Sequence, residues 1–214
     1  MKANADILDR LYNAKDPEEI AGIYNQWAKT YDMDLTEEAD YAAPGWCSNL
    51  LEKYVPSKDA RVLDAGAGTG LFGQLLHGRG YRNIVGMDIS EGMLTEAGKK
   101  GVYLELHRKA LGEALGFSSD SFEAVIAVGV FSPGQGPADA FDELIRIVRP
   151  GGYILFTLRS EFYEQSRFGF RPKQSKLEEA GRWMLEEKTG KFQGLPKSEP
   201  DLFYNVWVYR VTET

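Results

Sequence analysis

The chain has 214 residues, of which 43% are hydrophobic and 27% charged, and its net charge is −7. The length favours one domain over residues 1–214, and the negative charge disfavours nucleic acid as a partner because binding phosphates needs a basic surface. No apolar run reaches the roughly 18 residues that span a membrane, and the single Cys47 excludes an internal disulfide or a cysteine metal cluster. A cytoplasmic protein without a metal site is therefore expected.

The first 55 residues are expected to form helices outside the sheet core, which would occupy residues 56–214. Residues 1–17 predict a short helix, 18–31 a second and 40–54 a third. The second helix carries an aromatic stripe in which Tyr24, Trp27 and Tyr31 lie three or four residues apart. Such a stripe packs equally well in a core or on a ligand, and the sequence leaves both interpretations open.

Residues 61–73, R-V-L-D-A-G-A-G-T-G-L-F-G, predict a buried parallel strand, a tight glycine turn and the start of a helix. Gly68, Gly70 and Gly73 fit the spacing of a dinucleotide-binding loop. That loop would begin past Asp64, whose carboxylate at the strand end would repel a pyrophosphate. The carboxylate suits a ligand with an ammonium group and no phosphate, such as S-adenosylmethionine.

A second acidic strand end supports a nucleoside ligand. Residues 83–88 predict a short buried strand that ends in Asp88, about twenty residues after the glycine loop. In a doubly wound sheet this acid lies beside that loop, where it can accept hydrogen bonds from two ribose hydroxyls. It fits S-adenosylmethionine and a nicotinamide dinucleotide equally well.

The remaining pattern alternates strands and helices. Strands are expected over 102–107, 121–130 and 153–158, with a helix over 139–148 and an R-P-G-G turn at 149–152. A Gly/Pro-rich loop at 131–137 follows the fourth strand, where a substrate is expected. A broken helix over 159–181 and two strands over 182–192 and 203–211 complete the chain.

The motif D-A-G-A-G-T-G resembles the first motif of class I S-adenosylmethionine-dependent methyltransferases, and the similarity extends from about residue 20 to 157. Within that class, I-Y-N-Q-W-A-K-T-Y-D, K-A-L-G-E and V-G-V-F-S-P-G-Q resemble the methyltransferase-like proteins of the Williams–Beuren region family. The resemblance implies a Rossmann-like α/β fold. Its sheet would have seven strands, mostly parallel with an antiparallel C-terminal strand, and helices on both faces.

The resemblance also implies which residues contact S-adenosylmethionine or its product S-adenosylhomocysteine. Many relatives carry an acid in the loop after the third strand, and this acid binds the adenine amino group. This chain has Lys109 or Ala110 at that position, so backbone groups of Ala110 and Leu111 would replace the acid. The expected cofactor-binding residues are Tyr24, Trp27, Tyr31, Asp64, Ala65, Gly66, Ala67, Gly68, Asp88, Ile89, Met93, Ala110, Leu111, Val128, Gly129 and Val130.

The implied reaction is direct in-line methyl transfer to a small-molecule acceptor, by a protein expected to be a monomer. Such a transfer needs alignment more than a dedicated catalytic group. The candidates for a catalytic side chain are Tyr31, Ser132, Gln135 and His107. A nicotinamide-dependent reductase and a non-catalytic cofactor-binding module are the alternatives. The helix over 18–31 is expected to act as a lid that orders over bound cofactor.

Overall fold

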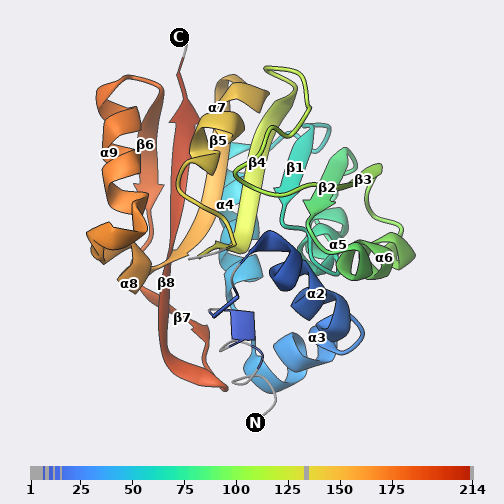
Figure 1. Cartoon of the computed structure of the whole chain (residues 1–214). Coiled ribbons are helices and arrows are strands. Elements are labelled where there is room, and N and C mark those ends of the chain that lie inside the picture. The colour runs from blue at the N-terminus through green and yellow to red at the C-terminus, as the bar shows by residue number, and fades with distance from the viewer. Residues whose placement is uncertain (1–6, 8–9, 12, 15, 133–134, 213–214) are drawn as a thin grey trace.

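The computed structural model describes residues 7, 10–11, 13–14, 16–132 and 135–212. Within these residues, eight strands form one sheet in the order β3-β2-β1-β4-β5-β8-β6, and β7 pairs with β8. Figure 1 shows the sheet from one face, with β6 at one side and β3 at the other. The strands are β1 (Val62–Ala65), β2 (Ile84–Asp88), β3 (Glu105–Arg108), β4 (Phe122–Phe131), β5 (Val148–Arg159), β6 (Trp183–Lys188), β7 (Phe192–Leu195) and β8 (Glu199–Val211).

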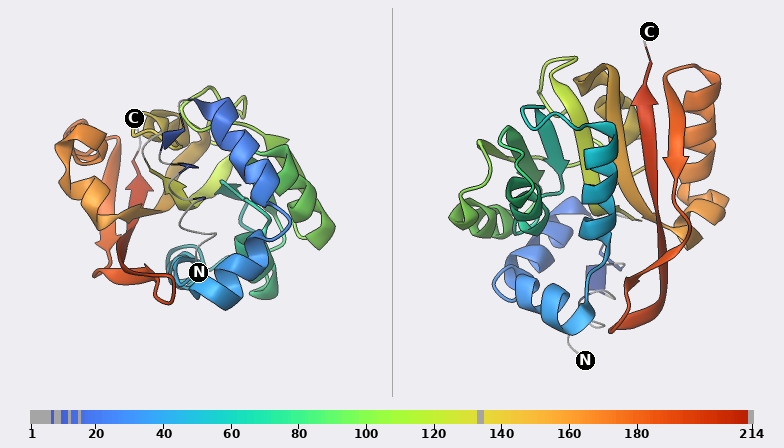
Figure 2. Two further views of the ribbon diagram at one scale, coloured as in Figure 1. Left: turned by 60° about the horizontal axis from the view of Figure 1, so that its bottom comes forward. Right: turned by 180° about the vertical axis from the view of Figure 1, so that it is seen from behind.

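The first five strands are parallel, and β8 runs antiparallel between β5 and β6. The two views of Figure 2 show helices on both faces of the sheet. The helices are α2 (Pro17–Trp27), α3 (Tyr31–Met33), the π-helix η1 (Asp34–Ala39), α4 (Ala43–Tyr54), α5 (Leu71–Gly78), α6 (Glu91–Lys100), α7 (Ala140–Ile147), α8 (Ser160–Glu164), the 3₁₀-helix η2 (Ser166–Phe168) and α9 (Phe170–Glu179).

Side chains alternate between two cores because successive residues of a strand point to opposite faces. In β1, Leu63 joins the core beneath α7 and α9, whereas Val62 joins the core beneath α4 and α5. All four residues of β1 are buried, as a parallel strand covered on both faces should be. The α/β fold expected from the sequence, with a mostly parallel sheet and an antiparallel C-terminal strand, is confirmed.

The carboxyl ends of the parallel strands face a cap of short helices (Figure 1). We use "cap segment" for residues 17–39, which comprise α2, α3 and η1. Helix α2 begins where Asp16 accepts a hydrogen bond from the Glu19 N–H and Pro17 occupies the first turn. Helix α4 lies outside the cap segment, because it packs against β4 and β5 in the sheet core.

The hairpin of β7 and β8 packs against the cap segment and is hydrogen-bonded to residues at its C-terminal end. The Ala42 N–H donates to the Gly194 carbonyl at 3.1 Å, and the Lys197 N–H donates to the Ala39 carbonyl at 3.3 Å. Leu195 and Leu202 of the hairpin share a small core with Ile20 and other cap residues. The cap is therefore tied to the last strands of the chain as well as to the sheet edge.

Four expected elements differ from the structure. The helix predicted over 18–31 ends at Trp27, and α3 starts anew at Tyr31 after a turn. The strand predicted over 102–107 forms only at Glu105–Arg108, since this edge strand is largely exposed. The expected strand at 182–192 divides into β6 and β7, and β8 starts at Glu199. The sheet thus has eight strands where seven were expected.

Three further expected segments are reshaped or lie partly outside the described residues. The R-P-G-G turn lies inside β5 as an irregularity, since Phe122 pairs with Val148 and Ala124 already pairs with Tyr153. The helix expected over 1–17 falls largely outside the described residues, as does part of the loop over 131–137.

Candidate functional site

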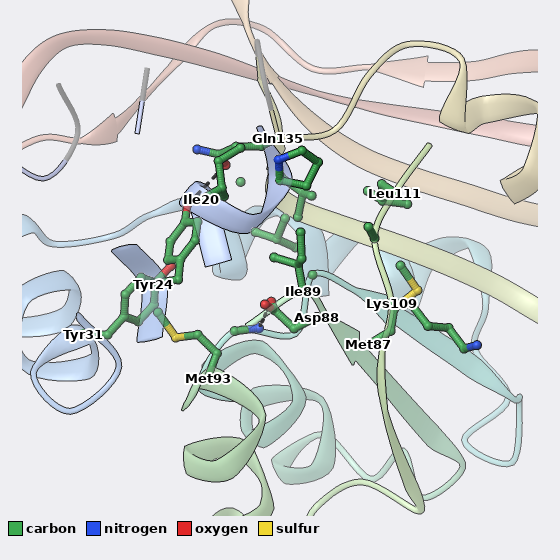
Figure 3. A pocket seen from close by; sticks show the side chains of 17 residues that line it. Ile20, Tyr24, Tyr31, Met87, Asp88, Ile89, Met93, Lys109, Leu111 and Gln135 are labelled. Carbon is green, nitrogen blue, oxygen red and sulfur yellow. Dashed lines mark hydrogen bonds between the residues drawn. The ribbon is translucent and has the colours of Figure 1, made fainter. Parts of the chain in front are cut away.

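A pocket opens between the cap segment and the carboxyl ends of β1, β2 and β4 (Figure 3). The cap segment contributes one wall, the glycine loop and the end of β2 contribute the floor, and residues after β3 and β4 close the far side. The lining residues are Pro17, Ile20, Tyr24, Tyr31, Gly66, Gly68, Met87, Asp88, Ile89, Met93, Lys109, Ala110, Leu111, Val128, Gly129, Val130 and Gln135.

The backbone donors of the glycine loop are largely used within the protein. The N–H groups of Gly66 and Ala67 both donate to the Met87 carbonyl at 2.8 Å, and that of Gly70 donates to the Ala67 carbonyl. The Gly68 N–H donates to Asp88 Oδ2 at 2.9 Å. A pyrophosphate needs free loop donors, so this loop offers it little while presenting a carboxylate. The geometry weighs against a dinucleotide.

The glycine spacing has a structural cause in Tyr103, which precedes β3. A Cβ on Gly73 would overlap the Tyr103 hydroxyl, and a Cβ on Gly70 or Gly86 would lie 3.0–3.1 Å from its ring. Gly70 and Gly73, two of the three glycines that match the dinucleotide spacing, therefore make room for an aromatic side chain. The Tyr103 hydroxyl donates to Asp64 Oδ2 at 2.7 Å.

Asp64 lies behind the glycine loop and is 1% exposed. Its second oxygen, Oδ1, is buried without a hydrogen-bond partner among the described residues. The pKa of Asp64 is raised to about 7, chiefly by burial; the hydrogen bond from Tyr103 opposes the shift and the nearby charge of Asp88 adds to it. The carboxyl group is thus poised to lose its proton near neutral pH.

Asp88 connects β2, the glycine loop and α6. Its Oδ1 accepts from the Ser90 N–H and its Oδ2 from the Gly68 N–H, each at 2.9 Å. Burial raises the pKa of Asp88, although backbone N–H groups stabilise the ionised form. A carboxylate has about four acceptor positions, so these bonds leave capacity for a ligand hydroxyl. Figure 3 shows this carboxylate on the pocket floor.

Apolar groups line the pocket beside Asp88. Ile89 and Met93 lie on one side, and Ala110 and Leu111 form the opposite strip. The Lys109 ammonium is 5.3 Å from the Phe117 ring centroid, and in Figure 3 its side chain points away from the pocket centre. A flat heterocycle between these walls would meet only backbone polar groups along that strip.

Tyrosines gather at the cap end of the pocket. Tyr24 donates from its hydroxyl to Gln135 Oε1 at 3.2 Å, which joins the cap to the segment after β4. Burial, with the charges of Asp88 and Asp32, raises the pKa of Tyr31 well above its ordinary value. The Tyr41 hydroxyl fills the space that a Cβ on Gly129 would occupy. With its pKa raised, Tyr31 stays neutral at physiological pH.

Most residues expected to bind the cofactor line the pocket together, as do Tyr31 and Gln135 among the catalytic candidates. The other expected residues do not line it. Trp27 is packed in the cap and donates from Nε1 to Asp34 Oδ2 at 2.6 Å. His107 lies on the edge strand, with its Nε2 2.9 Å from Glu105 Oε2. Ser132 is buried. The other three expected residues that do not line the pocket are Asp64, Ala65 and Ala67, which are also buried.

Four lining residues were not expected from the sequence: Pro17, Ile20, Met87 and Lys109. Ile20 belongs to the apolar stripe of α2, and Met87 directly precedes Asp88, so both had a local signal. The described residues contain no group of three or more His, Cys, Asp or Glu that could hold a metal, and none of their helices is long and apolar enough to span a bilayer.

Comparison with known proteins identifies the class. Residues 63–156 match the family model described as a methyltransferase domain. Human methyltransferase-like protein 27 is 35% identical over 164 residues, which are 75% of this chain and 66% of that protein. The chain belongs to the class I S-adenosylmethionine-dependent methyltransferases. This confirms the resemblance seen in the sequence.

Two further similarities agree with this class. Demethylmenaquinone methyltransferase of Clavibacter sepedonicus is 30% identical over 148 residues, which are 66% of this chain and 58% of that protein. An S-adenosylmethionine-dependent methyltransferase from Mesorhizobium loti has the same fold, with a TM-score of 0.61 and 18% identity over 78% of this chain and 98% of that structure. The chain spans only about three fifths to two thirds of these two curated relatives.

The pocket of this methyltransferase fits S-adenosylmethionine, the cofactor of its class. Gly68, at φ +54, has nothing within 4 Å of the position of a Cβ, so a ligand can approach its backbone closely. Asp88 has spare acceptor positions for a ribose, and Asp64, which has an unpartnered buried oxygen, lies behind the loop without lining the pocket. A nucleoside with a cationic, phosphate-free tail suits these groups.

We predict that the free energy of unfolding of Asp64→Asn increases relative to that of the unchanged methyltransferase as the pH rises from about 4 to about 7. The folded state binds the Asp64 proton more tightly than the unfolded chain, so the stability contributed by Asp64 is complete below its ordinary pKa of 3.8 and is lost as the pH rises through about 7. Urea unfolding at unit pH steps should show the difference growing by at most about 1.4 kcal/mol per pH unit. A difference independent of pH would contradict the shifted pKa.

Proposed function

We propose that this protein transfers the methyl group of S-adenosylmethionine to a small-molecule acceptor by direct in-line displacement. The observation that carries the proposal is the combination of Asp88 on the pocket floor with a glycine loop whose donors are already bonded internally. That combination favours a nucleoside without phosphates. The relatives named methyltransferase-like protein 27 and demethylmenaquinone methyltransferase support the same activity.

Each part of the pocket has a role in this proposal. Asp88 holds the ribose hydroxyls, and Ile89 and Met93 pack against the adenine while the backbone of Ala110 and Leu111 offers it polar contacts. Residues 128–130 lie at the end of β4, next to the cap, where the acceptor approaches. The cap segment excludes water from the transfer.

Among the described residues, the pocket supplies alignment and no general base. The cofactor brings a methyl group on a sulfonium sulfur, which is a good leaving group. Correct orientation can lower the barrier by about 7–11 kcal/mol. The ionisable side chains that line the described part of the pocket are two tyrosines, Asp88 and Lys109. Tyr31 is held neutral and Asp88 is committed to the loop and the ribose. The acceptor therefore brings a nucleophile that needs no proton removed by the protein.

Incubation with methyl-labelled S-adenosylmethionine and a panel of small carboxylic acids, phenols, amines and thiols tests the activity. We expect label transfer to at least one acceptor, with a pH dependence that follows the ionisation of the acceptor. Tight cofactor binding with no transfer to any acceptor class would favour the non-catalytic binding module instead.

We predict that Asp88→Ala weakens binding of S-adenosylhomocysteine at least about tenfold, because each hydrogen bond to a charged group contributes about 1.5–3 kcal/mol. Calorimetric titration measures the dissociation constant. Asp88→Asn keeps the volume and one acceptor oxygen, so its loss should be smaller. The matched control is Glu91→Ala, which removes an exposed acid three residues away that does not line the pocket.

Circular dichroism and thermal unfolding establish that the Asp88 variants fold. An unchanged dissociation constant in folded Asp88→Ala would mean that Asp88 serves only to join the glycine loop to α6.

A further inference from the structure

Helix α6 contacts the cap segment at both of its ends. At its start, Asn25 Oδ1 of the cap accepts from the Gly92 N–H and the Ser90 hydroxyl, each at 2.8 Å. Gly92 has to be small here, because a Cβ would lie 3.0 Å from the Asn25 Cα. At its other end, Lys100 reaches back to the cap. The helix thus holds the cap segment at two points about ten residues apart along the chain.

Lys100 bridges the cap segment and the glycine loop. Its ammonium donates to Asp32 Oδ2 of the cap at 2.7 Å and to the Thr69 carbonyl of the loop at 2.8 Å. The Thr69 hydroxyl donates to Asp32 Oδ1, which closes a ring of three residues. The Lys100 side chain is 15% exposed. This arrangement differs from an isolated surface ion pair, which contributes little to stability.

The bridge joins residues that are next to the two sides of the pocket. Asp32 directly follows Tyr31, which lines the cap side, and Thr69 directly follows Gly68, which lines the floor. A displacement of either partner would therefore move a residue that faces the ligand. Neither Lys100 nor Thr69 lines the pocket itself, so any effect on the ligand acts through their neighbours.

We propose that Lys100 is a positioning residue that locks the cap segment onto the glycine loop and thereby slows release of the cofactor. The inference rests on the proposed function, since it takes S-adenosylmethionine and S-adenosylhomocysteine as the occupants. Opening the cap breaks the Lys100–Asp32 and Thr69–Asp32 hydrogen bonds, whereas Lys100 keeps its bond to the Thr69 carbonyl. Asp32 of the cap is therefore held by the end of α6 and by the glycine loop together.

The neighbouring Lys99 provides a matched control. It occupies the same last turn of α6, so it has the same favourable interaction with the helix dipole. Its side chain is 64% exposed and pairs only with Glu96 of its own helix. A change from Lys99 to Met therefore removes a charge from the helix end without touching the cap or the loop.

The test measures release of labelled S-adenosylhomocysteine after a chase with unlabelled ligand. We expect release from Lys100→Met to be at least about tenfold faster than from the unchanged protein, and release from Lys99→Met to change less than twofold. The double variant Asp32→Asn/Lys100→Met should release no faster than Lys100→Met alone, because the two side chains act through one contact. Equal release from the two lysine variants, or full additivity in the double variant, would overturn the proposal.

Amide exchange of residues 17–39 gives a second measurement that does not depend on the ligand. In the free protein, exchange of the cap segment should be faster in Lys100→Met than in Lys99→Met, while exchange in β4 and β5 stays equal in both. Equal cap exchange would also refute the bridge. Failure of the unchanged protein to bind S-adenosylhomocysteine would instead refute the proposed cofactor, and the exchange comparison would still decide the role of Lys100.

Discussion

The carboxylate of Asp88 is the group on which the arrangement of the site depends. It accepts one hydrogen bond from the glycine loop and one from the start of α6, so it fixes the relative positions of β1, β2 and that helix. The same helix then holds the cap segment through Asn25 and Lys100. Because Asp88 also faces the pocket, the residue that assembles the site is the one expected to bind the ribose.

The choice between ligands follows from where the loop donors point. Gly66, Ala67, Gly68 and Gly70 all donate to acceptors within the protein, which leaves no ready cradle for a pyrophosphate. The buried Asp64 and the pocket-facing Asp88 add two acids near the loop, and desolvation raises the pKa of both. Such a site disfavours an anionic ligand and suits one that carries a positive charge. The glycine spacing alone would have suggested the opposite.

Local patterns in the sequence were sufficient for the sheet and for the pocket floor. The strand ending in Asp88 and the alternate glycines after Asp64 have strong local signatures, and both were placed correctly. Contacts between distant segments had no such signature. The contacts of Tyr103 with Gly73 and Asp64, and of Lys100 with Asp32, each join residues that are thirty or more apart in the sequence. Trp27 differs, because its partner Asp34 is only seven residues away; the sequence left core packing and ligand contact equally open for its aromatic stripe, and the fold places it in the cap.

Calorimetric titration of the unchanged protein with S-adenosylmethionine, S-adenosylhomocysteine, NAD and NADP shows whether the pocket prefers an adenosyl cofactor to a dinucleotide. We expect binding of the two adenosyl ligands in the micromolar range and no measurable heat from either dinucleotide. Tight binding of NADP without binding of S-adenosylmethionine would contradict it.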